Sequence, residues 1–332
     1  MPVTQKDIAR QLGVSRSLVS RALTGTAEAI GAHPATILRI QDTARKLGYI
    51  PNATARKLRG KGKPVIGVMI ADMGDPYFSQ TATEVIRQVH ARGFALAVAG
   101  FDRRIVDHDD IMVLLEQDLA GLLMIGGADI PWLNLFPRRK LPVVRIGDAK
   151  READIHHVGV DDTSGFRQLF RHLFKHGHRR IGWVTANQPV HQSRASRARI
   201  IARQVGLKWN NKHDISGGNE VLLAGREGGQ RLLAASAKSL PTAVVCSSDA
   251  IALGVISVLT AGGLRVPGDL SVTGFDDLAL SSLASPPLTT LHQPISDMIR
   301  NALDLLSYPS LRIIHKKFPA QLVVRASTGA AI

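Results

Sequence analysis

Short apolar runs alternate with helical patterns along most of this chain, and this alternation constrains the fold more than any other feature. The runs begin after Pro64, and residues with apolar positions at helical spacing separate them. Successive parallel strands need such crossover segments, so the pattern predicts parallel sheets covered by helices on both faces. About ten runs would make an unusually wide single sheet, which favours two sheets. The clearest runs are 65–71, 94–100, 121–127, 141–147, 180–186, 243–249 and 270–276.

Length and composition narrow the class of protein. With 332 residues, 45% of them hydrophobic, the chain can form several cores. No apolar run approaches the roughly 20 residues of a membrane span, and the N-terminus does not resemble a secretory signal. The single cysteine, Cys246, excludes an intramolecular disulfide and ends an apolar run, where a buried thiol is expected. We therefore expect a soluble, cytoplasmic protein with no membrane contact.

The charge is distributed unevenly along the chain. Residues 1–63 contain 12 Lys/Arg and 3 Asp/Glu, whereas residues 64–332 contain 30 and 24. A strongly basic N-terminal block ahead of a nearly balanced body predicts a polyanion-binding head joined to a domain with another task.

Residues 4–23 carry two short helical patterns separated by one turn. Thr4 and Asp7 have the spacing of a capping box, Gly13 ends the first pattern, and Ser15 is a good N-cap for the second. The apolar residues of the second pattern share one face, which leaves the other face polar and basic. Such a pair predicts a helix-turn-helix, whose second helix enters the major groove of DNA. An ordinary amphipathic helical hairpin is the alternative.

The outward residues of this segment divide into two groups by their chemistry. Arg16 and Ser17 lie in the first turn of the second pattern, and Arg21 shares a face with Ser17, so these three are candidates for contacts with base edges. Small hydroxyl groups near helix N-termini suit phosphate contacts that set the position on DNA without reading bases. These hydroxyls belong to Thr4, Ser15 and Ser20.

A third helix is predicted over 34–47, and a basic segment follows at 52–64. Taken alone, NATARKLRGKGKP is typical of a solvated linker, since glycine and lysine dominate its second half. Asn52 can nevertheless cap a short helix in which Ala55 and Leu58 share a face at i, i+3. Arg56 and Arg59 would then lie along phosphates.

Several of these motifs occur in the order found in one protein family. Thr4 to Arg21, then LGYIPN at 47–52 and ARKLRGK at 55–61, resemble the head and hinge of the LacI/GalR family of bacterial transcription regulators. The resemblance implies a DNA-binding head (1–48), a hinge helix and linker (49–63), and a two-lobed effector-binding and dimerisation domain (64–332). It also implies that Leu58 wedges between base pairs in the minor groove of the operator. The loop at 24–36 is longer than is usual in the family.

Polar residues follow the apolar runs of the body, where ligands of parallel sheets bind. Each aspartate among them has an alternative use as the cap of the next helix. These residues are Asp72, Gly126, Gly147, Asp148, Asp161, Ser248, Asp249, Asp276 and Asp277.

The family resemblance continues more loosely to about residue 325. GDPYFSQ (74–80), SSDAIALG (247–254) and SVTGFDD (271–277) resemble landmarks of the family's periplasmic-binding-protein-like effector domain. This resemblance implies a cleft between two lobes that binds a small molecule, commonly a sugar or sugar derivative. The matching positions assign effector contacts to Tyr77, Phe78, Asp161, Arg194, Ser248 and Asp276.

The chain departs from the family pattern at two positions near this cleft. Arg197 stands where the family usually has a glycine, and Glu220 stands where an aromatic residue often stacks on the ligand. Together with Arg145 and Arg194, Arg197 would make the cleft more basic. A sugar acid or sugar phosphate is therefore an alternative to a neutral sugar, because arginine matches carboxylate and phosphate well.

The common catalytic motifs GxxxxGK[ST], GxSxG and HExxH do not occur in the sequence. Three histidines at 172, 176 and 178 surround the end of a predicted helix, which does not suggest a metal site. We expect no enzyme activity, no cofactor and no metal. The expected function is that of a repressor that binds a pseudo-palindromic operator as a homodimer and responds to an effector. A sugar-binding transport-type protein and a nucleotide-linked sugar enzyme with a basic head are the alternatives.

Overall fold

A computed structural model describes residues 3–49, 63–100, 108–126, 141–147, 155–236, 238–308 and 312–331. The chain forms two compact units, Met1–Lys63 and Pro64–Ile332, which we describe separately as the head and the body.

The head is a three-helix unit around a small apolar core. Its elements are α1 (Gln5–Leu12), α2 (Arg16–Leu23), the 3-10 helix η1 (Glu28–Ile30) and α3 (Pro34–Lys46). Thr4 and Asp7 form both halves of the capping box, and Gly13 ends α1 with a φ of 66°. The long loop at 24–36 contains η1, and its Ala27 is buried in the core beside Ile8, Val19 and Ile40. The three predicted helices are therefore present, and the long loop packs against them.

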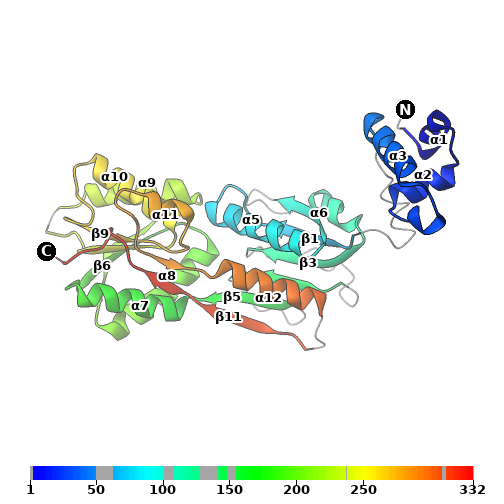
Figure 1. Cartoon of the computed structure of the whole chain (residues 1–332). Helices are drawn as coiled ribbons and strands as arrows, with labels where there is room; N and C mark the ends of the chain where they lie inside the picture. The colour runs from blue at the N-terminus through cyan, green and yellow to red at the C-terminus, as the bar shows by residue number, and fades with distance from the viewer. Residues whose placement is uncertain are drawn as a thin grey trace. The chain divides into compact units, whose positions relative to one another are not determined.

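The first lobe of the body is built on a six-stranded parallel sheet with the order β11-β5-β4-β3-β1-β2. Helices α5 and α12 pack on one face of this sheet, and α6 packs on the other (Figure 1). The strands are β1 (Val65–Ile70), β2 (Ala95–Gly100), β3 (Leu119–Ile125), β4 (Val143–Ile146), β5 (His156–Asp161) and β11 (His315–Pro319). The helices are α5 (Pro76–Ala91), α6 (His108–Leu115) and α12 (Ile295–Ser307).

The second lobe is built on a four-stranded parallel sheet with the order β7-β6-β8-β9. Helices α7 and α8 cover one face of the sheet, and α9 and α10 cover the other. The strands are β6 (Arg180–Thr185), β7 (Lys208–Ser216), β8 (Ala243–Cys246) and β9 (Ser271–Thr273). The helices are α7 (Asp162–Lys175), α8 (Pro189–Val205), α9 (Val221–Leu233), α10 (Asp249–Ala261) and the short α11 (Ala279–Leu283).

The chain passes between the two lobes three times. It passes from β5 into α7, from β10 (Thr290–His292) into α12, and from β11 into β12 (Gln321–Val323). Strands β10 and β12 pair antiparallel beside these crossings. The prediction of two parallel sheets covered by helices is confirmed. In the part of the chain that the structure describes, no helix combines the length and apolarity needed to span a membrane.

Candidate functional site

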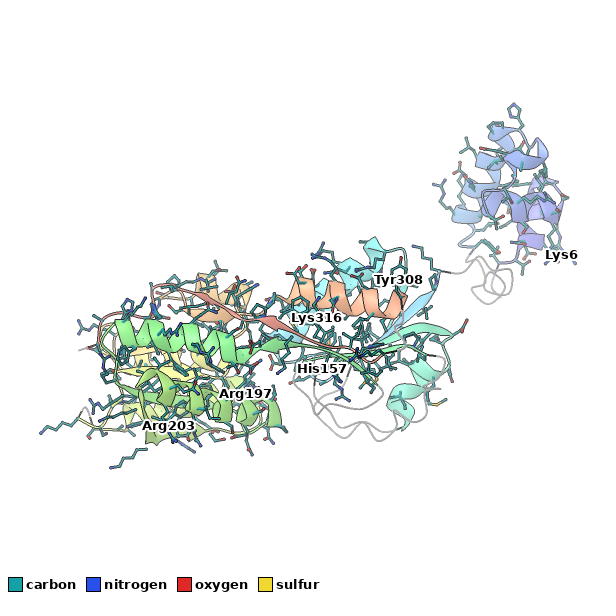
Figure 2. All side chains as sticks on the ribbon, turned by 90° about the horizontal axis from the view of Figure 1, so that it is seen from below. Lys6, His157, Arg197, Arg203, Tyr308 and Lys316 are labelled. Carbon is teal, nitrogen blue, oxygen red and sulfur yellow. The ribbon has the colours of Figure 1, made fainter. Side chains whose placement is uncertain are left out.

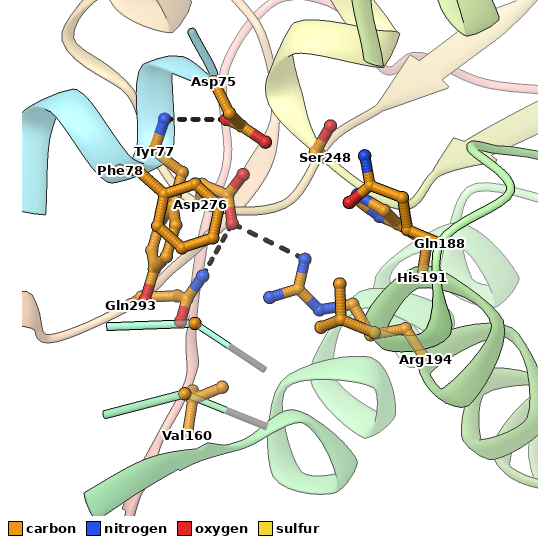
Figure 3. Close-up of a pocket in the computed structure, with 13 residues that line it drawn as sticks. Asp75, Tyr77, Phe78, Val160, Gln188, His191, Arg194, Ser248, Asp276 and Gln293 are labelled. Atoms are coloured by element: carbon orange, nitrogen blue, oxygen red, sulfur yellow. Dashed lines mark hydrogen bonds and ion pairs between the residues drawn. The ribbon is translucent and has the colours of Figure 1, made fainter. Parts of the chain in front are cut away.

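The body contains a pocket between its two lobes (Figure 3). Its volume is about 560 Å³ when the part open to solvent is included. Elements of both sheets supply the walls. The lining residues are Asp75, Tyr77, Phe78, Gly126, Gly147, Val160, Gln188, Val190, His191, Arg194, Ser248, Asp276 and Gln293.

Asp276 and Arg194 form the polar centre of this pocket. The Arg194 Nη1 atom lies 3.7 Å from Oδ1 of Asp276, and Gln293 donates a hydrogen bond of 2.6 Å to the same oxygen. Arg194 also donates to the backbone oxygen of Ser247 at 2.9 Å. Its guanidinium carbon lies 3.9 Å from the centre of the Phe275 ring. These contacts hold a donor and an acceptor group in place at the pocket wall.

Asp276 is held under unusual conditions. Its φ of 123° lies in the region that favours glycine, so the backbone stores strain at this residue. Burial raises the pKa of its carboxyl group well above the usual value; the Arg194 guanidinium opposes the rise, while the charges of Asp249 and Asp75 add to it. Strain and a perturbed pKa in one cleft residue are typical of functional sites.

Asp249 supports the pocket from behind. Its carboxylate accepts hydrogen bonds from the backbone N–H of Leu278 and from the hydroxyl groups of Ser281 and Thr290. Burial raises the pKa of Asp249, and the hydroxyl donors partly offset this rise. The residue ties the start of α10 to α11 and to strand β10, which leads into a crossing between the lobes.

Two aromatic rings form the wall contributed by α5. Asp75 accepts a hydrogen bond of 2.9 Å from the N–H of Tyr77, and Pro76 occupies the first helical position, so the sequence Asp-Pro begins the helix here. The Tyr77 and Phe78 rings meet edge to face, with centroids 5.3 Å apart. Burial, together with the Asp276 charge, raises the pKa of Tyr77, so its hydroxyl group keeps its proton.

The structure brings five of the six predicted effector contacts to this pocket. Asp161 is not among the described residues that line it, because its Oδ1 caps α7 by accepting hydrogen bonds from Thr163 and Ser164. The capping alternative therefore describes Asp161, and its neighbour Val160 lines the pocket instead. The five lining residues are Tyr77, Phe78, Arg194, Ser248 and Asp276.

Sequence reasoning missed four polar residues of the pocket, and one of these, Asp75, is the N-cap of α5. His191 lies one turn before Arg194 on α8, so its helical spacing from Arg194 could have identified it. Gln293 directly follows β10, and the rule that ligands bind beyond the ends of strands would have included it. Gln188 precedes the Pro189 that opens α8, a position with no comparable signal.

The residues that suggested a basic cleft lie elsewhere. Arg197 donates hydrogen bonds of 2.7 Å to Asp162 and of 2.7 Å to Ser193, and Glu220 is the exposed residue that precedes α9. Neither they nor Arg145 are among the described residues that line the pocket. Arg194 remains, and it faces Asp276 and, at 3.9 Å, Asp162. Among the described residues, Arg194 is therefore the one Lys or Arg side chain that lines the pocket.

The head presents its candidate residues on the outer face of α2. Arg16, Ser17 and Arg21 are exposed, while Val19 and Ala22 on the opposite face are buried. Ser15 accepts a hydrogen bond of 3.1 Å from the N–H of Leu18 and so caps α2. Thr4 is exposed within the capping box of α1, and Ser20 is half-buried. The predicted hinge contacts Asn52, Ala55, Arg56, Leu58 and Arg59 lie outside the described residues.

The histidines near the end of α7 have structural partners. His172 lies 3.0 Å from the hydroxyl of Thr328, and His178 contacts both the hydroxyl of Thr242 and the backbone oxygen of Gly329. Across the described ranges, no group of three or more His, Cys, Asp or Glu residues could hold a metal ion.

Comparison with known proteins places the chain in a family. Residues 4–52 match the family described as bacterial regulatory proteins, lacI family, and residues 170–328 match the periplasmic binding protein-like domain. The transcriptional regulator GalR of Escherichia coli K12 is 30% identical over 319 residues, which cover 91% of this chain and 88% of GalR. The transcriptional repressor CytR of the same strain is 28% identical over 337 residues and covers 98% of this chain and 96% of CytR.

A solved structure shows the same fold. The crystal structure of the lac repressor dimer bound to operator and the anti-inducer ONPF has a TM-score of 0.76 at 24% identity, and the match covers 99% of this chain and 100% of that one. The motifs of the head, the two-lobed body and these relatives agree, and the chain belongs to the LacI/GalR family of bacterial transcription regulators.

Proposed function

We propose that this protein is a ligand-responsive repressor that binds a pseudo-palindromic operator as a homodimer in the bacterial cytoplasm. A small effector in the pocket of the body sets its affinity for DNA, and the pocket binds the effector without turning it over. The observation that carries this proposal is the pairing, in one chain, of an exposed basic recognition helix with a pocket built around Asp276 and Arg194.

DNA recognition is assigned to α2. The guanidinium groups of Arg16 and Arg21 are exposed, so they are free to pair with guanine edges or phosphates. The small hydroxyl groups of Thr4, Ser15 and Ser20 would hold the head on phosphates. By the family resemblance, a hinge helix capped by Asn52 and carrying Ala55, Arg56, Leu58 and Arg59 would add contacts in the minor groove.

The effector is assigned to the class of neutral, hydroxyl-rich molecules such as sugars and nucleosides. Asp276 offers an acceptor and Arg194 a donor, an arrangement that fits neighbouring hydroxyl groups. The Tyr77 and Phe78 rings would pack against an apolar face of the same molecule. Because carboxylates already face Arg194, a sugar acid or phosphate would meet repulsion as well as attraction.

Coupling between effector and DNA is assigned to closure of the lobes. The Gln80 side chain of α5 accepts a hydrogen bond of 3.4 Å from the N–H of Ala279, at the start of α11 in the second lobe. An effector that touches both lobes would favour the closed arrangement, in which this contact forms. The effector must bind the two arrangements unequally for DNA affinity to change.

The homodimer is assigned to exposed apolar side chains of the body. Leu280 and Leu283 on α11 are 57% and 79% exposed, and Val98 is exposed on the edge strand β2. Contiguous exposed apolar side chains mark interaction surfaces, and Leu280 and Leu283 lie together on one short helix. Leu283→Glu should shift the protein from dimer to monomer in analytical ultracentrifugation, whereas Ile200→Glu, at another exposed apolar site, should not.

The function can be tested in two steps with the full chain. Selection from random duplexes should yield a pseudo-palindromic operator, and Arg16→Ala or Arg21→Ala should weaken binding and relax the sequence preference. Thermal-shift screening should then find neutral sugars or nucleosides that raise the melting temperature, because a ligand of the folded state stabilises it.

Asp276→Asn should abolish that shift while operator binding persists. Stabilisation by sugar acids or phosphates alone would contradict the effector class, and unchanged binding by both arginine variants would contradict the recognition helix.

A further inference from the structure

One long segment of the body contains cations and no acids. Residues 163–213 include 11 Lys/Arg and neither Asp nor Glu, although acids are otherwise spread through the body. The proposed pocket uses one of these cations, Arg194. Neither effector binding in the pocket nor DNA binding by α2 accounts for the other cations of this segment.

The fold gathers many of these cations on one outer layer. Helices α7 and α8 pack against each other and bury their apolar sides on the same face of the four-stranded sheet. Their charged side chains therefore point to solvent. Arg167, Arg171 and Lys175 follow one another at i, i+4 along α7, and all three are exposed. Arg203, near the end of α8, is exposed as well (Figure 2). Lys208, at the start of β7, is also exposed.

Two neighbouring cations of the same segment are already neutralised. Arg197 pairs with Asp162 at 2.7 Å, and Arg199 pairs with Asp214. By contrast, in the described ranges no acidic group lies within ion-pair distance of the five exposed cations. We call these five residues the α7–α8 face: Arg167, Arg171, Lys175, Arg203 and Lys208.

We propose that the α7–α8 face binds the phosphate backbone of a DNA segment other than the one held by the head. Successive cations on α7 rise about 6 Å along the helix, so they form a row that an extended polyanion can follow. A second copy of this chain would bring like charges together, which disfavours self-association through this face. The inference goes beyond the proposed function, and its choice of DNA as the partner rests on that function.

DNA fits the face better than a small anion does. The five cations stand on the outer side of two helices and of a strand end, and they do not converge on the pocket described above. Separate cations on an open surface gain affinity by releasing counterions from a polyanion, which a single small anion cannot supply. Nucleic acid is also the polyanion that a DNA-bound regulator meets at high local concentration.

The test uses the full chain and a short duplex that lacks the operator sequence. Binding is measured by fluorescence anisotropy at several salt concentrations for the parent and for Arg171→Gln/Lys175→Gln. The matched control, Arg226→Gln/Arg231→Gln, removes two exposed cations from α9, on the opposite side of the same sheet. The slope of log Kobs against log salt should become shallower by up to about 1.8 in the face variant, and by much less in the control.

A third variant separates this inference from the function of the head. Arg16→Gln/Arg21→Gln should lower duplex binding by itself, and its effect should add to that of the face variant if the two surfaces act independently. Equal slopes for the face variant, the control and the parent would overturn the proposal and leave an acidic protein surface as the partner. A thermal melt of each variant checks folding, and the single variant Arg171→Gln, with an expected change of about 0.9, replaces any pair that fails to fold.

Discussion

Arg16 in the head and Arg194 in the pocket are the same kind of side chain in opposite settings. Arg16 is exposed in the first turn of α2. Arg194 is 6% exposed and lies among Asp276, Asp162 and the ring of Phe275. An exposed arginine is available to a new partner, whereas a buried one already neutralises charges that the fold has removed from water. The setting therefore decides whether losing the side chain affects binding alone or stability as well.

The same contrast applies to the two regions as wholes. In the head, the core lies on one side of α2 and the candidate DNA contacts lie on the other, so packing and binding use different residues. In the pocket, Asp276 takes part in a buried network that also involves Gln293 and Arg194, between elements of both lobes. Under the proposed function, binding by the head would depend on surface charge and on salt, while binding in the pocket would depend on groups fixed before the ligand arrives.

The largest expected effect comes from Arg194→Ala. This change leaves the buried carboxyl group of Asp276 without its cation, whereas Asp162 keeps Arg197 at 2.7 Å, so it should lower the free energy of unfolding by about 3–5 kcal/mol. Urea unfolding followed by tryptophan fluorescence measures the body, because all three tryptophans lie beyond residue 64. Amide hydrogen exchange along α1, α2 and α3 measures the head. Arg16→Ala serves as the control and should change stability by less than about 0.5 kcal/mol. Similar losses in both variants would break the contrast between the two settings.

A smaller effect is expected on operator binding. Arg16→Ala should weaken binding to the selected operator by about 1–3 kcal/mol if the side chain pairs with a base. The affinity for other duplexes should change much less, since a base contact carries sequence information and a phosphate contact does not. A uniform loss across all duplexes would show that Arg16 contacts phosphate instead.

The head was predictable because its signals are local. The N-cap Ser15 and the turn residue Gly13 act within a few residues of their own positions, so their effects can be recognised in a short window. Strands with continuous apolar runs were predicted to within a few residues for the same reason. Strand β7 (Lys208–Ser216) was missed because this edge strand is mostly polar and lacks such a run.

The pocket was predictable only in part because distant segments assemble it. Asp161 and Asp276 both follow apolar runs, yet α7 begins directly after Asp161, so that carboxylate caps the helix. After Asp276 the chain continues through Asp277, and both residues have positive φ, so no helix begins there to take up the carboxylate. Sequence patterns do not report this difference in backbone conformation. The role of Gln188 depends in the same way on tertiary structure.

A still smaller change is expected when the cap of α2 is removed. Ser15→Ala loses the hydrogen bond to the N–H of Leu18 and should destabilise α2 by about 1 kcal/mol. Amide hydrogen exchange along α2 measures this, since local opening is reported residue by residue. Ser17→Ala is the control, because this exposed side chain is not the cap and its loss should leave exchange unchanged. Faster exchange in both variants would mean that the exposed face of α2 also supports the fold.

The smallest expected effect is a dependence of the body's stability on pH. The exposed arginines of the head do not contribute to it. Burial, with the nearby charges of His176 and His178, lowers the pKa of His172 from 6.5 to about 4. The unfolded chain therefore gains a proton near pH 6.5, while folded His172 stays neutral down to about pH 4. Stability should fall as the pH drops through this window and level off below it.

Solvent screening at this half-buried ring reduces the effect to on the order of 1 kcal/mol. Urea unfolding by tryptophan fluorescence at pH 7 and pH 4.5 measures the fall, which His172→Gln should diminish, because glutamine can still reach the hydroxyl of Thr328 but does not titrate. If His172→Gln shows the same pH dependence as the parent, another group of the body causes it. The contrast between the two regions would then rest on Arg16 and Arg194 alone.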